Sequence, residues 1–551
     1  MAVRRRRRGL PSWRAAWAAA TVALLTAQGA AAATEPLPSF AELEAAGARI
    51  GEIRIQSREI FDLDDPKEDK LLFRWANALH IQTRPSVVER SLLFKTGDPV
   101  SVHVIEETER VLRGNRYLYD VVLKPVAYRD GVVDIEVVTR DTWTLDLGVS
   151  LGRTGGATTS GWRISDYNIF GTGTSLSFGR SNDVDRSSNT FQFTNPRAFG
   201  GWTTVSLSHS VNSDGNRDAF TVVRPFYALE ARWSAGVSAA KDDRIDAVYN
   251  AGEVVSEYRH QADRAEVFGG WSQGLVDGWV QRTSVGIRAQ DDAYALEPGR
   301  VPPAELPPDE TLVGPFVRYQ WIEDRYLKEQ NRNVIGRPEY FDLGLAATVQ
   351  LDWASSAFGS SLDALLYSAR ISRGFEPGPG QTLMTSATIS GRLIDGRVSR
   401  QYLGGRAEYF RPQGPRWLFY ASASGDLLTE PGPQDELLLG GENGLRGYPL
   451  RYQSGTQRAL FTVEERFYTD LYLWQLFRIG AAGFYDIGRA WGGDNVNTDN
   501  PGWLSNIGAG LRIVSARAAF NTVVHVDIAV PLQATASMDK VQFLVTTKSS
   551  Y

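Results

Sequence analysis

An arginine within a glycine-rich segment has the setting in this chain that most clearly suggests chemistry. Arg446 lies between Gly440 and Pro449, a stretch with four glycines, and Asp486 follows on a segment with the composition of an amphipathic strand. Glycines let such a loop fold tightly into a confined space, where a guanidinium persists only if it is paired and hydrogen-bonded. We therefore predict an ion pair between Arg446 and Asp486, and the lumen of a β-barrel is the confined space we expect.

The carboxylates after the loop differ in how well the strand pattern orients them. Glu464 lies on a segment in which polar residues alternate with apolar ones, so we expect it to face inward. Asp486 shares its face with Phe484, and alternation alone does not orient it strongly. Asp527 alternates more cleanly with valines and an isoleucine.

Motifs of other chemistry occur in unsuitable contexts. Gly148 to Gly152 matches the Gly-x-Ser-x-Gly nucleophile elbow, but an elbow joins a strand to a helix, and Ser150 lies within a predicted strand that a glycine-rich hairpin follows. Asp183 and Asp185 have the spacing that opens a calcium loop, but Ser188 stands where the loop requires glycine. The five histidines form no metal-ligand or triad motif, and the chain has no cysteine. We expect no enzyme activity, no metal and no cofactor.

The N-terminus has the pattern of a secretory signal peptide. Arginines at Arg4 to Arg8 precede an apolar run from Ala15 to Ala27, and small residues continue to Ala33. A transmembrane anchor needs about 20 apolar residues, and this run is shorter. The pattern therefore favours a signal peptide over residues 1–33. That segment holds six arginines and no acids, so the remaining chain has 53 basic and 64 acidic residues and a net charge of −11. Nucleic acid is therefore not an expected partner.

Residues 142–551 have the sequence pattern of an outer-membrane β-barrel. Segments of about ten alternating residues are separated by clusters of Gly, Asp, Asn, Ser and Pro. Soluble sandwiches alternate as well, but the signal peptide, the absence of a convincing helix and the abundance of Trp and Tyr favour a barrel. We call the segment around Arg446, with Gly440 to Pro449 at its centre, the arginine loop. Five strands follow Tyr448, and as many as fifteen candidate strands precede this loop, which gives an upper count near twenty.

A small α+β domain is predicted over residues 48–141, after a linker over residues 34–47. The expected elements are a strand over 50–60, a helix from Pro85, a helix over 101–112, and a hairpin of strands over 119–128 and 132–139.

Residues 63–84 interrupt this pattern. Four large apolar residues, Leu71, Leu72, Trp75 and Leu79, indicate an extra helix there, which we expect to add packing to the domain rather than a binding site.

The N-terminal order, with the motifs Leu93 to Asp98 and Leu112 to Tyr117 within it, resembles a POTRA domain. This domain is the periplasmic module of the BamA/TamA outer-membrane protein assembly superfamily, the bacterial surface antigen type, and one copy fits before the barrel. The resemblance implies sixteen strands, with five after the loop. We favour this number, and we expect some segments between Leu312 and Leu428 to be halves of long strands or excursions outside the membrane.

The arginine loop strengthens the resemblance. The superfamily's hallmark is an Arg-Gly-Phe/Tyr tip on the sixth extracellular loop, folded into the barrel against acids on the following strands. Arg446, Gly447 and Tyr448 match the tip, Glu464 matches the acid of the Glu-x-Arg strand, and Asp486 matches the acid of the Phe-x-Asp-x-Gly strand. The resemblance implies that these five residues form a lumenal latch.

The resemblance also implies a function that is physical rather than catalytic. The expected protein lies in the outer membrane of a Gram-negative-type bacterium, with the POTRA-like domain in the periplasm, and assists insertion, assembly or translocation of other proteins. Its implied partners are outer-membrane lipid, client outer-membrane or secreted proteins, and periplasmic assembly factors. A client strand can add to a POTRA edge, and the seam between the first and last strands can open. Two alternatives remain: a two-partner-type secretion pore, and a passive porin or surface antigen without assembly activity.

Overall fold

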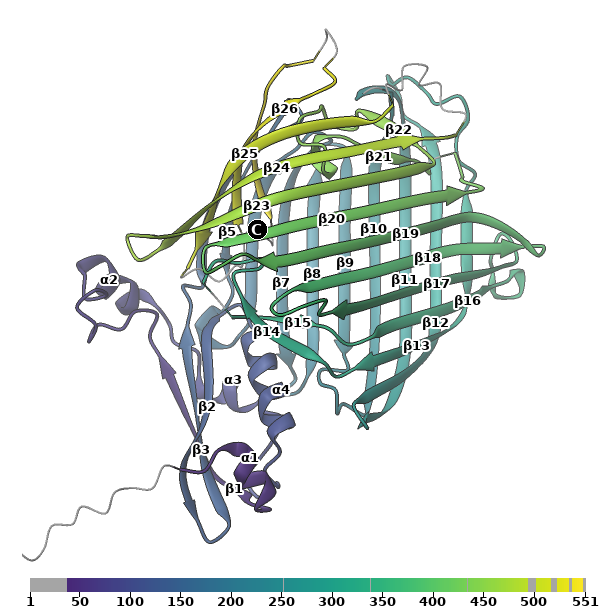
Figure 1. Cartoon of the computed structure of the whole chain (residues 1–551). Coiled ribbons are helices and arrows are strands. Elements are labelled where there is room, and N and C mark those ends of the chain that lie inside the picture. Colours follow the sequence, from purple (N-terminus) through teal and green to yellow (C-terminus); the bar gives the residue numbers. More distant parts are fainter. Residues whose placement is uncertain are drawn as a thin grey trace, which may run out of the picture.

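A small α+β domain lies against one end of a large β-barrel (Figure 1). The structure, a computed structural model, describes residues 37–250, 252–336, 338–433, 435–493, 502–516, 523–534 and 538–548. The predicted signal peptide, residues 1–33, lies outside the described residues. We call the end of the barrel next to the N-terminal domain the domain end, and the opposite end the far end.

The N-terminal domain packs three of its four helices on a three-stranded sheet with the order β1-β3-β2, in which β1 and β3 are parallel. Its elements are α1 (Phe40–Ala45), β1 (Arg49–Arg58), α2 (Leu71–Leu79), α3 (Pro85–Glu89), α4 (Val102–Arg113), β2 (Leu118–Arg129) and β3 (Val132–Asp141). The core gathers apolar residues from every element except α2, among them Val88, Leu112 and Ile135.

Residues 40–45 differ from the predicted linker over 34–47. Ser39 and Glu42 form a capping box that starts α1, and Leu43 is fully buried in the domain core. The proline-containing start of this segment hid a helix that is too short to show periodicity, so the domain begins several residues before the predicted boundary at 48.

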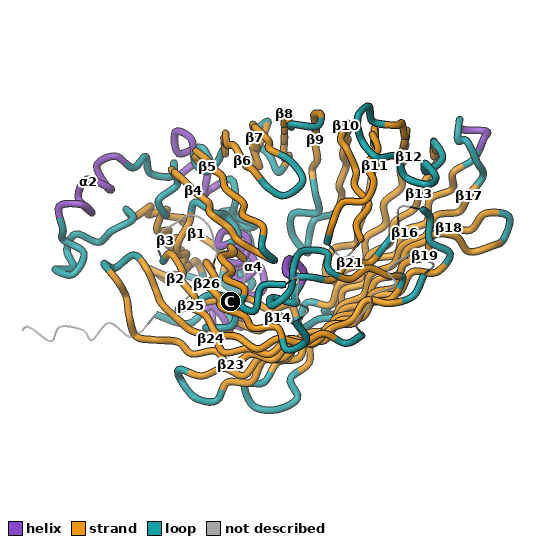
Figure 2. Tube along the Cα trace, turned by 90° about the horizontal axis from the view of Figure 1, so that it is seen from above, coloured by secondary structure: helices purple, strands orange, loops and turns teal. Residues whose placement is uncertain are grey.

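The barrel closes through twenty antiparallel strands in the described part of the chain. The wall consists of β4 (Leu145–Thr154), β5 (Ala157–Asp166), β6 (Ser175–Asn182), β7 (Ser187–Ala198), β8 (Thr203–Asn212), β9 (Gly215–Arg224), β10 (Trp233–Asn250), β11 (Glu253–Val276), β12 (Trp279–Leu296), β13 (Glu310–Glu323), β16 (Ala346–Ala354), β17 (Ala364–Phe375), β18 (Thr382–Ile394), β19 (Arg397–Pro412), β20 (Trp417–Thr429), β23 (Gln457–Leu473), β24 (Phe477–Trp491), β25 (Leu504–Ser515), β26 (Val523–Pro531) and β27 (Gln542–Lys548). Seen from above, these strands surround the interior (Figure 2).

The favoured number of sixteen strands is wrong. Fifteen wall strands precede the arginine loop and five follow it among the described residues, which equals the upper count read from alternation. Between Leu312 and Leu428, only β14 and β15 leave the wall; the other segments are wall strands with their own turns. Because barrel diameter grows with strand number, twenty strands enclose a wider lumen than the expected sixteen.

Two short ribbons lie apart from the wall. One is formed by β14 (Tyr326–Gln330) and β15 (Pro338–Asp342), in the connection between β13 and β16 at the domain end. The other is formed by β21 (Leu437–Leu439) and β22 (Gln453–Gly455), in the arginine loop at the far end. The described residues also form three 3-10 turns: η1 (Ile169–Gly171), η2 (Ser356–Phe358) and η3 (Gly441–Asn443).

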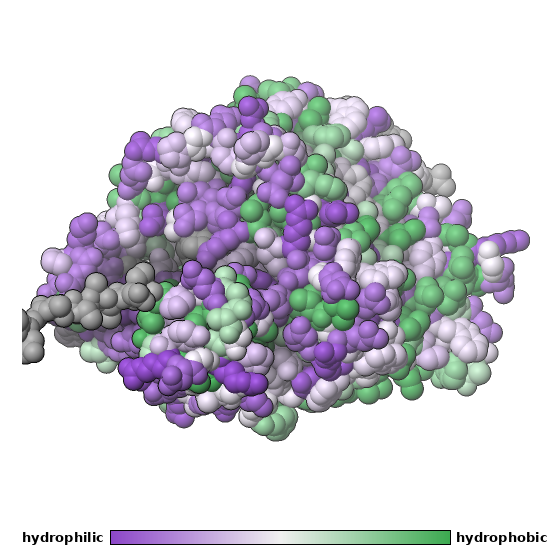
Figure 3. Space-filling model, turned by 60° about the horizontal axis from the view of Figure 1, so that its bottom comes forward, coloured by the Kyte–Doolittle hydropathy of each residue, from purple (hydrophilic) through white to green (hydrophobic). Residues whose placement is uncertain are grey.

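The wall strands alternate apolar side chains outward with polar side chains inward. On β23, Phe461 and Val463 are 44% and 41% exposed, whereas Thr462 and Glu464, which alternate with them, are buried. Hydrophobic side chains gather on the flank of the barrel at the right of Figure 3, which is viewed with the domain end forward. This alternation is typical of a barrel with an apolar surround and a polar lumen. None of the helices in the described residues is long and apolar enough to cross a membrane.

The wall is weakest where the last strand meets the first. Within the described residues, the β27–β4 ladder consists of Val545 opposite Arg153. On either side the ladders are continuous, from Val523 to Ala529 between β26 and β27 and over all of β4 with β5. The barrel is therefore closed by a seam with far fewer backbone hydrogen bonds than its neighbours.

Candidate functional site

The arginine loop enters the barrel from the far end and is held there by an apolar cluster. Leu439, Leu445 and Tyr448 are fully buried, and they pack with Ala490 and Leu504 of the wall. The β21–β22 ribbon forms the stem of the loop, and η3 precedes its tip. The loop thus places a charged side chain against the inner face of the wall.

Arg446 forms a fork of hydrogen bonds to two carboxylates. Its Nε and Nη2 donate to the two oxygens of Asp486 at 2.8 and 2.7 Å, and its Nη1 donates to Glu464 at 2.8 Å. The guanidinium also stacks on Phe484, 3.4 Å from the ring centroid, and Asp527 is 3.8 Å away. The arginine side chain is 7% exposed. Lysine lacks both the fork and the planar stacking surface.

Gly447 and Tyr448 fit the tip to the wall. Gly447 donates its N–H to Asn506 at 3.1 Å, and a Cβ at this position would lie 2.6 Å from the Cβ of Asn506. The Tyr448 hydroxyl donates to the carbonyl of Ser505 and approaches the side chain of Gln533, each at 3.0 Å. Position 447 requires glycine because the loop approaches β25 too closely for a Cβ. Position 448 requires tyrosine because its hydroxyl bonds to buried polar groups.

The five residues selected from the sequence meet at one place, and the structure adds partners that the pattern did not reveal. Asp486 also accepts hydrogen bonds from Thr462 and Asn506, at 2.9 and 2.8 Å. Glu464 also accepts from Arg466 at 2.9 Å, and Asp527 pairs with Arg512. The alternation of these strands identified an inner face, but it carried no signal for which inner residues meet.

A second arginine ties the same loop across the lumen to the opposite wall. Arg451 donates from both Nη atoms to Asp185, at 2.7 Å each, and lies over the ring of Tyr249 at 4.2 Å. Its side chain is 19% exposed. Arg446 and Arg451 therefore hold the loop between the β23–β24 wall and the β6–β7 connection.

The β14–β15 hairpin enters the lumen from the domain end. Its tip residues Val334 and Ile335 are buried against wall residues that include Tyr420 and Tyr468. Glu339 accepts the N–H groups of residues 332, 333 and 334 at 3.0 to 3.2 Å, which stabilises the turn. Arg466 donates to the carbonyl of Arg332 at 3.1 Å. Because Arg466 also contacts Glu464, the hairpin and the arginine loop share one ion-pair network.

The N-terminal domain contacts the hairpin through α4. Glu109 accepts from Lys328 at 3.4 Å and from the Tyr340 hydroxyl at 3.2 Å, and Arg110 lies 4.3 Å from the ring centroid of Tyr326. Glu107 accepts the N–H of Leu229. A continuous set of polar contacts therefore runs from α4 through the hairpin to Arg446.

His103 makes the docking of α4 sensitive to pH. Its ring lies 3.5 Å from Glu107 and 3.0 Å from Asp324 at the end of β13, with Arg110 also facing Asp324. The interaction with Glu107 and the charge of Asp324 raise the pKa of His103 above its ordinary value, against the opposing effects of burial and Arg110. Because the pKa of His103 is higher in the docked state, protonated His103 stabilises docking fully below its undocked pKa. This stabilisation is lost as the pH rises through the docked pKa.

Glu107 lies on α4 itself, so the pair of His103 with Asp324 is the one that undocking breaks. We therefore expect docking of α4 to weaken by less than about 1 kcal/mol as the pH rises through the pKa of His103. The measurement is hydrogen exchange of residues 102–113 in the full protein, corrected for intrinsic rates. The variant His103→Gln serves as the control and is expected to show no change with pH. An equal pH dependence in both proteins would assign the effect to other groups.

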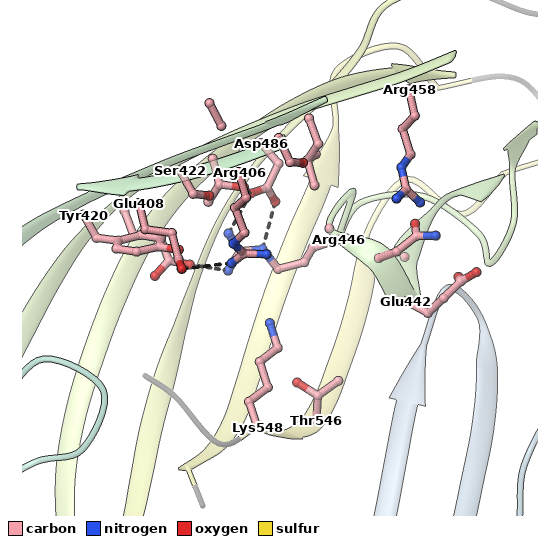
Figure 4. A pocket seen from close by; sticks show the side chains of 18 of the residues that line it. Arg406, Glu408, Tyr420, Ser422, Glu442, Arg446, Arg458, Asp486, Thr546 and Lys548 are labelled. Carbon is pink, nitrogen blue, oxygen red and sulfur yellow. Dashed lines mark hydrogen bonds and ion pairs between the residues drawn. The ribbon is translucent and has the colours of Figure 1, made fainter. Parts of the chain in front are cut away.

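A cavity of about 760 Å³ adjoins the latch (Figure 4). Its lining includes Arg406, Glu408, Tyr420, Arg458 and Lys548, from wall strands on either side of the arginine loop. The cavity is polar and gives water access to one side of the ion-pair network.

Other motifs have structural roles. Ser150 lies inside β4, without the strand-to-helix turn of a nucleophile elbow. Asp183 accepts the N–H groups of residues 185 and 186, and Asp185 pairs with Arg451. No group of three or more potential metal-ligating side chains occurs within the described residues.

No family model matches the chain, and no curated protein matches it. Several solved structures are similar to it, including the following three. CdiB from Acinetobacter baumannii is 13% identical, with a TM-score of 0.44 over 91% of this chain and 73% of that one. CdiB from Escherichia coli is 11% identical, with a TM-score of 0.45 over 91% and 76%. BamA from Haemophilus ducreyi lacking POTRA domains 1–3 is 12% identical, with a TM-score of 0.37 over 90% and 84%. At TM-scores below 0.5, these likenesses support no inference about function.

Proposed function

We propose that this chain is an outer-membrane barrel protein of the BamA/TamA type that assists insertion, assembly or translocation of other proteins. The observation that carries the proposal is the buried fork of Arg446 to Asp486 and Glu464, with Gly447 and Tyr448 fitted beside it. The apolar outer face supports an outer-membrane position. The N-terminal domain is then a single POTRA-like domain in the periplasm, and the domain end of the barrel is the periplasmic end.

The mechanism follows from the seam. Within the described residues, the facing edges of β4 and β27 share one ladder pair, so most of the backbone N–H and C=O groups on these two edges have no ladder partner. Such edges accept added strands. In this proposal a client strand pairs with β4 or β27, while the latch keeps the rest of the barrel in one shape. The hairpin and the loop both occupy the lumen, which argues against the alternative of a passive porin. No step of this mechanism requires catalysis, and we propose no enzyme activity for the chain.

A disulfide across the seam tests the proposal. The chain has no cysteine, so Arg153→Cys with Val545→Cys forms a single new bond between opposed residues of β4 and β27. We expect the oxidised variant to lose most of its activity, and a reductant to restore it, because a locked seam cannot admit a client strand. The measurement is the set of folded proteins in outer membranes of cells that depend on this variant.

The matched control places the same lock where the wall is continuous. Leu511→Cys with Val526→Cys joins opposed residues of β25 and β26, and its oxidation is expected to leave activity unchanged. Normal outer-membrane composition with the seam fully oxidised would rule out a mechanism that needs the seam to open.

Crosslinking from the β2–β3 hairpin distinguishes assembly of outer-membrane proteins from two-partner-type secretion. β2 is an edge of the N-terminal sheet, and Val122 on it is 44% exposed. A photoreactive residue at 122 is expected to capture unfolded outer-membrane proteins if the protein assists assembly. Capture of a single secreted protein would instead support the two-partner-type pore.

A further inference from the structure

Helix α2 turns its apolar side away from the domain to which it belongs. Leu71, Leu72, Trp75 and Leu79 are 64% to 73% exposed, and at helical spacing they lie within an arc of about 100°. The expected packing of the helix onto the domain is made by Phe73, whereas these four side chains point away from it. The helix contains one charged residue, Arg74, and that residue lies outside the arc.

The opposite side of α2 fixes the helix to the domain and to the adjoining end of the barrel. Phe73 is buried and stacks on Phe61 with ring centroids 4.0 Å apart. Trp143, just before β4, and Leu476, in the turn between β23 and β24, pack against the same cluster. Asn77 exchanges hydrogen bonds with the backbone of Phe61, at 3.1 and 2.8 Å. Because its inner side is held this firmly, the outward direction of the apolar side is built into the fold.

The exposed side of α2 continues an apolar surface of the barrel. Beside it, the end of β23 carries exposed Leu471 and the β23–β24 turn carries exposed Trp474, and β4 carries exposed Leu147 and Val149. In Figure 1, α2 stands apart from the other helices, next to this turn. Trp and Leu without charge at the end of a lipid-facing wall are typical of a segment that lies at a membrane interface.

We propose that the exposed side of α2, formed by Leu71, Leu72, Trp75 and Leu79, inserts into the periplasmic leaflet of the outer membrane beside the barrel seam. The inference rests on the membrane position given to the barrel and goes beyond the proposed function, because it gives the domain a second attachment, to lipid. The occupant is a lipid surface rather than a protein, because the helix side is continuous with the wall that lipid covers. The attachment would hold the domain at a set angle beneath the seam.

Depth measurements on the full protein in lipid test this. The cysteine-free chain allows single nitroxide labels at Leu72→Cys and Leu79→Cys in nanodiscs of phosphatidylethanolamine and phosphatidylglycerol. We expect collisions with a water-soluble nickel reagent to be several-fold lower there than at two controls. Arg74→Cys is exposed on the same helix outside the apolar arc, and Val132→Cys is an exposed apolar position at the turn between β2 and β3.

A second variant gives an independent readout. Adding Leu71→Glu to the Leu79→Cys protein is expected to return the label to water, while the barrel stays folded. Nickel accessibility at 72 and 79 equal to that at 74 in nanodiscs would overturn the proposal. Protection that appears in detergent and increases with protein concentration would also overturn it, because a second copy would then be the occupant.

Discussion

Replacing Arg446 with alanine is expected to free the arginine loop and abolish most of the activity while the barrel still forms. The change removes the hydrogen bonds to Asp486 and Glu464 and leaves these carboxylates close to Asp527 inside the lumen. Breaking a buried pair by removing one partner costs about 3 to 5 kcal/mol, and the adjoining polar cavity places the expected cost at the lower end. The measurement is proteolysis of the loop in membranes, alongside activity and the heat-modifiable mobility of the barrel.

Two variants make this result specific. Arg446→Lys keeps the charge but loses the fork, so we expect a partial loss. Arg451→Ala removes the other anchor of the same loop, a more exposed pair with Asp185, and is expected to cost about 0 to 1 kcal/mol. If the loop of Arg446→Ala resists protease as well as that of the unchanged protein, the fork does not hold the loop.

Removing the β14–β15 hairpin is expected to raise ion conductance several-fold. The hairpin fills the domain end of a twenty-strand lumen and carries the contact between Arg332 and Arg466. Replacing residues 328–340 with a short Gly-Ser link leaves β13 and β16 paired, so the wall should remain closed while its interior opens. Single-channel recording in planar bilayers gives the measurement.

The control is a shortening at the other end of the barrel. Removing residues 299–307, in the connection between β12 and β13, alters a far-end loop without touching the hairpin, and conductance should stay near that of the unchanged protein. Unchanged conductance in the hairpin variant would mean that the arginine loop alone closes the lumen. Weaker docking of α4 is also expected in the hairpin variant, because Lys328 and Tyr340, which bond to Glu109, are removed.

The strand number shows where a resemblance misled and the residues did not. Each wall strand has its own alternation and its own turn, so counting them reached twenty. The lower number of sixteen came from the family pattern, and no residue between Leu312 and Leu428 supported merging strands there. Only β14 and β15 lie outside the wall in that stretch, and their short length is what distinguishes them.

For the latch, the family motif was more informative than the strand pattern. Alternation oriented Glu464 but not Asp486, and the family motif selected both residues. The structure buries Asp486 completely and surrounds it with Thr462 and Asn506. Asn506 was missed because an asparagine on a strand gives no sign of its partner, and Arg466 because its second contact is with a hairpin 134 residues earlier in the chain.

Local pattern by itself determined the wall strands, their apolar and polar faces, the arginine loop and most helices of the domain, because alternation and turn residues act over a few consecutive positions. The closed barrel decided which inner side chains meet, how the two insertions share the lumen and where the seam lies. These depend on strand number and register, which are set only when β27 returns to β4. The direction of the apolar side of α2 was decided in the same way, by stacking of Phe73 on Phe61 in a cluster that Trp143 and Leu476 join. Helical spacing shows that a side is apolar, and tertiary contacts decide whether protein or lipid covers it.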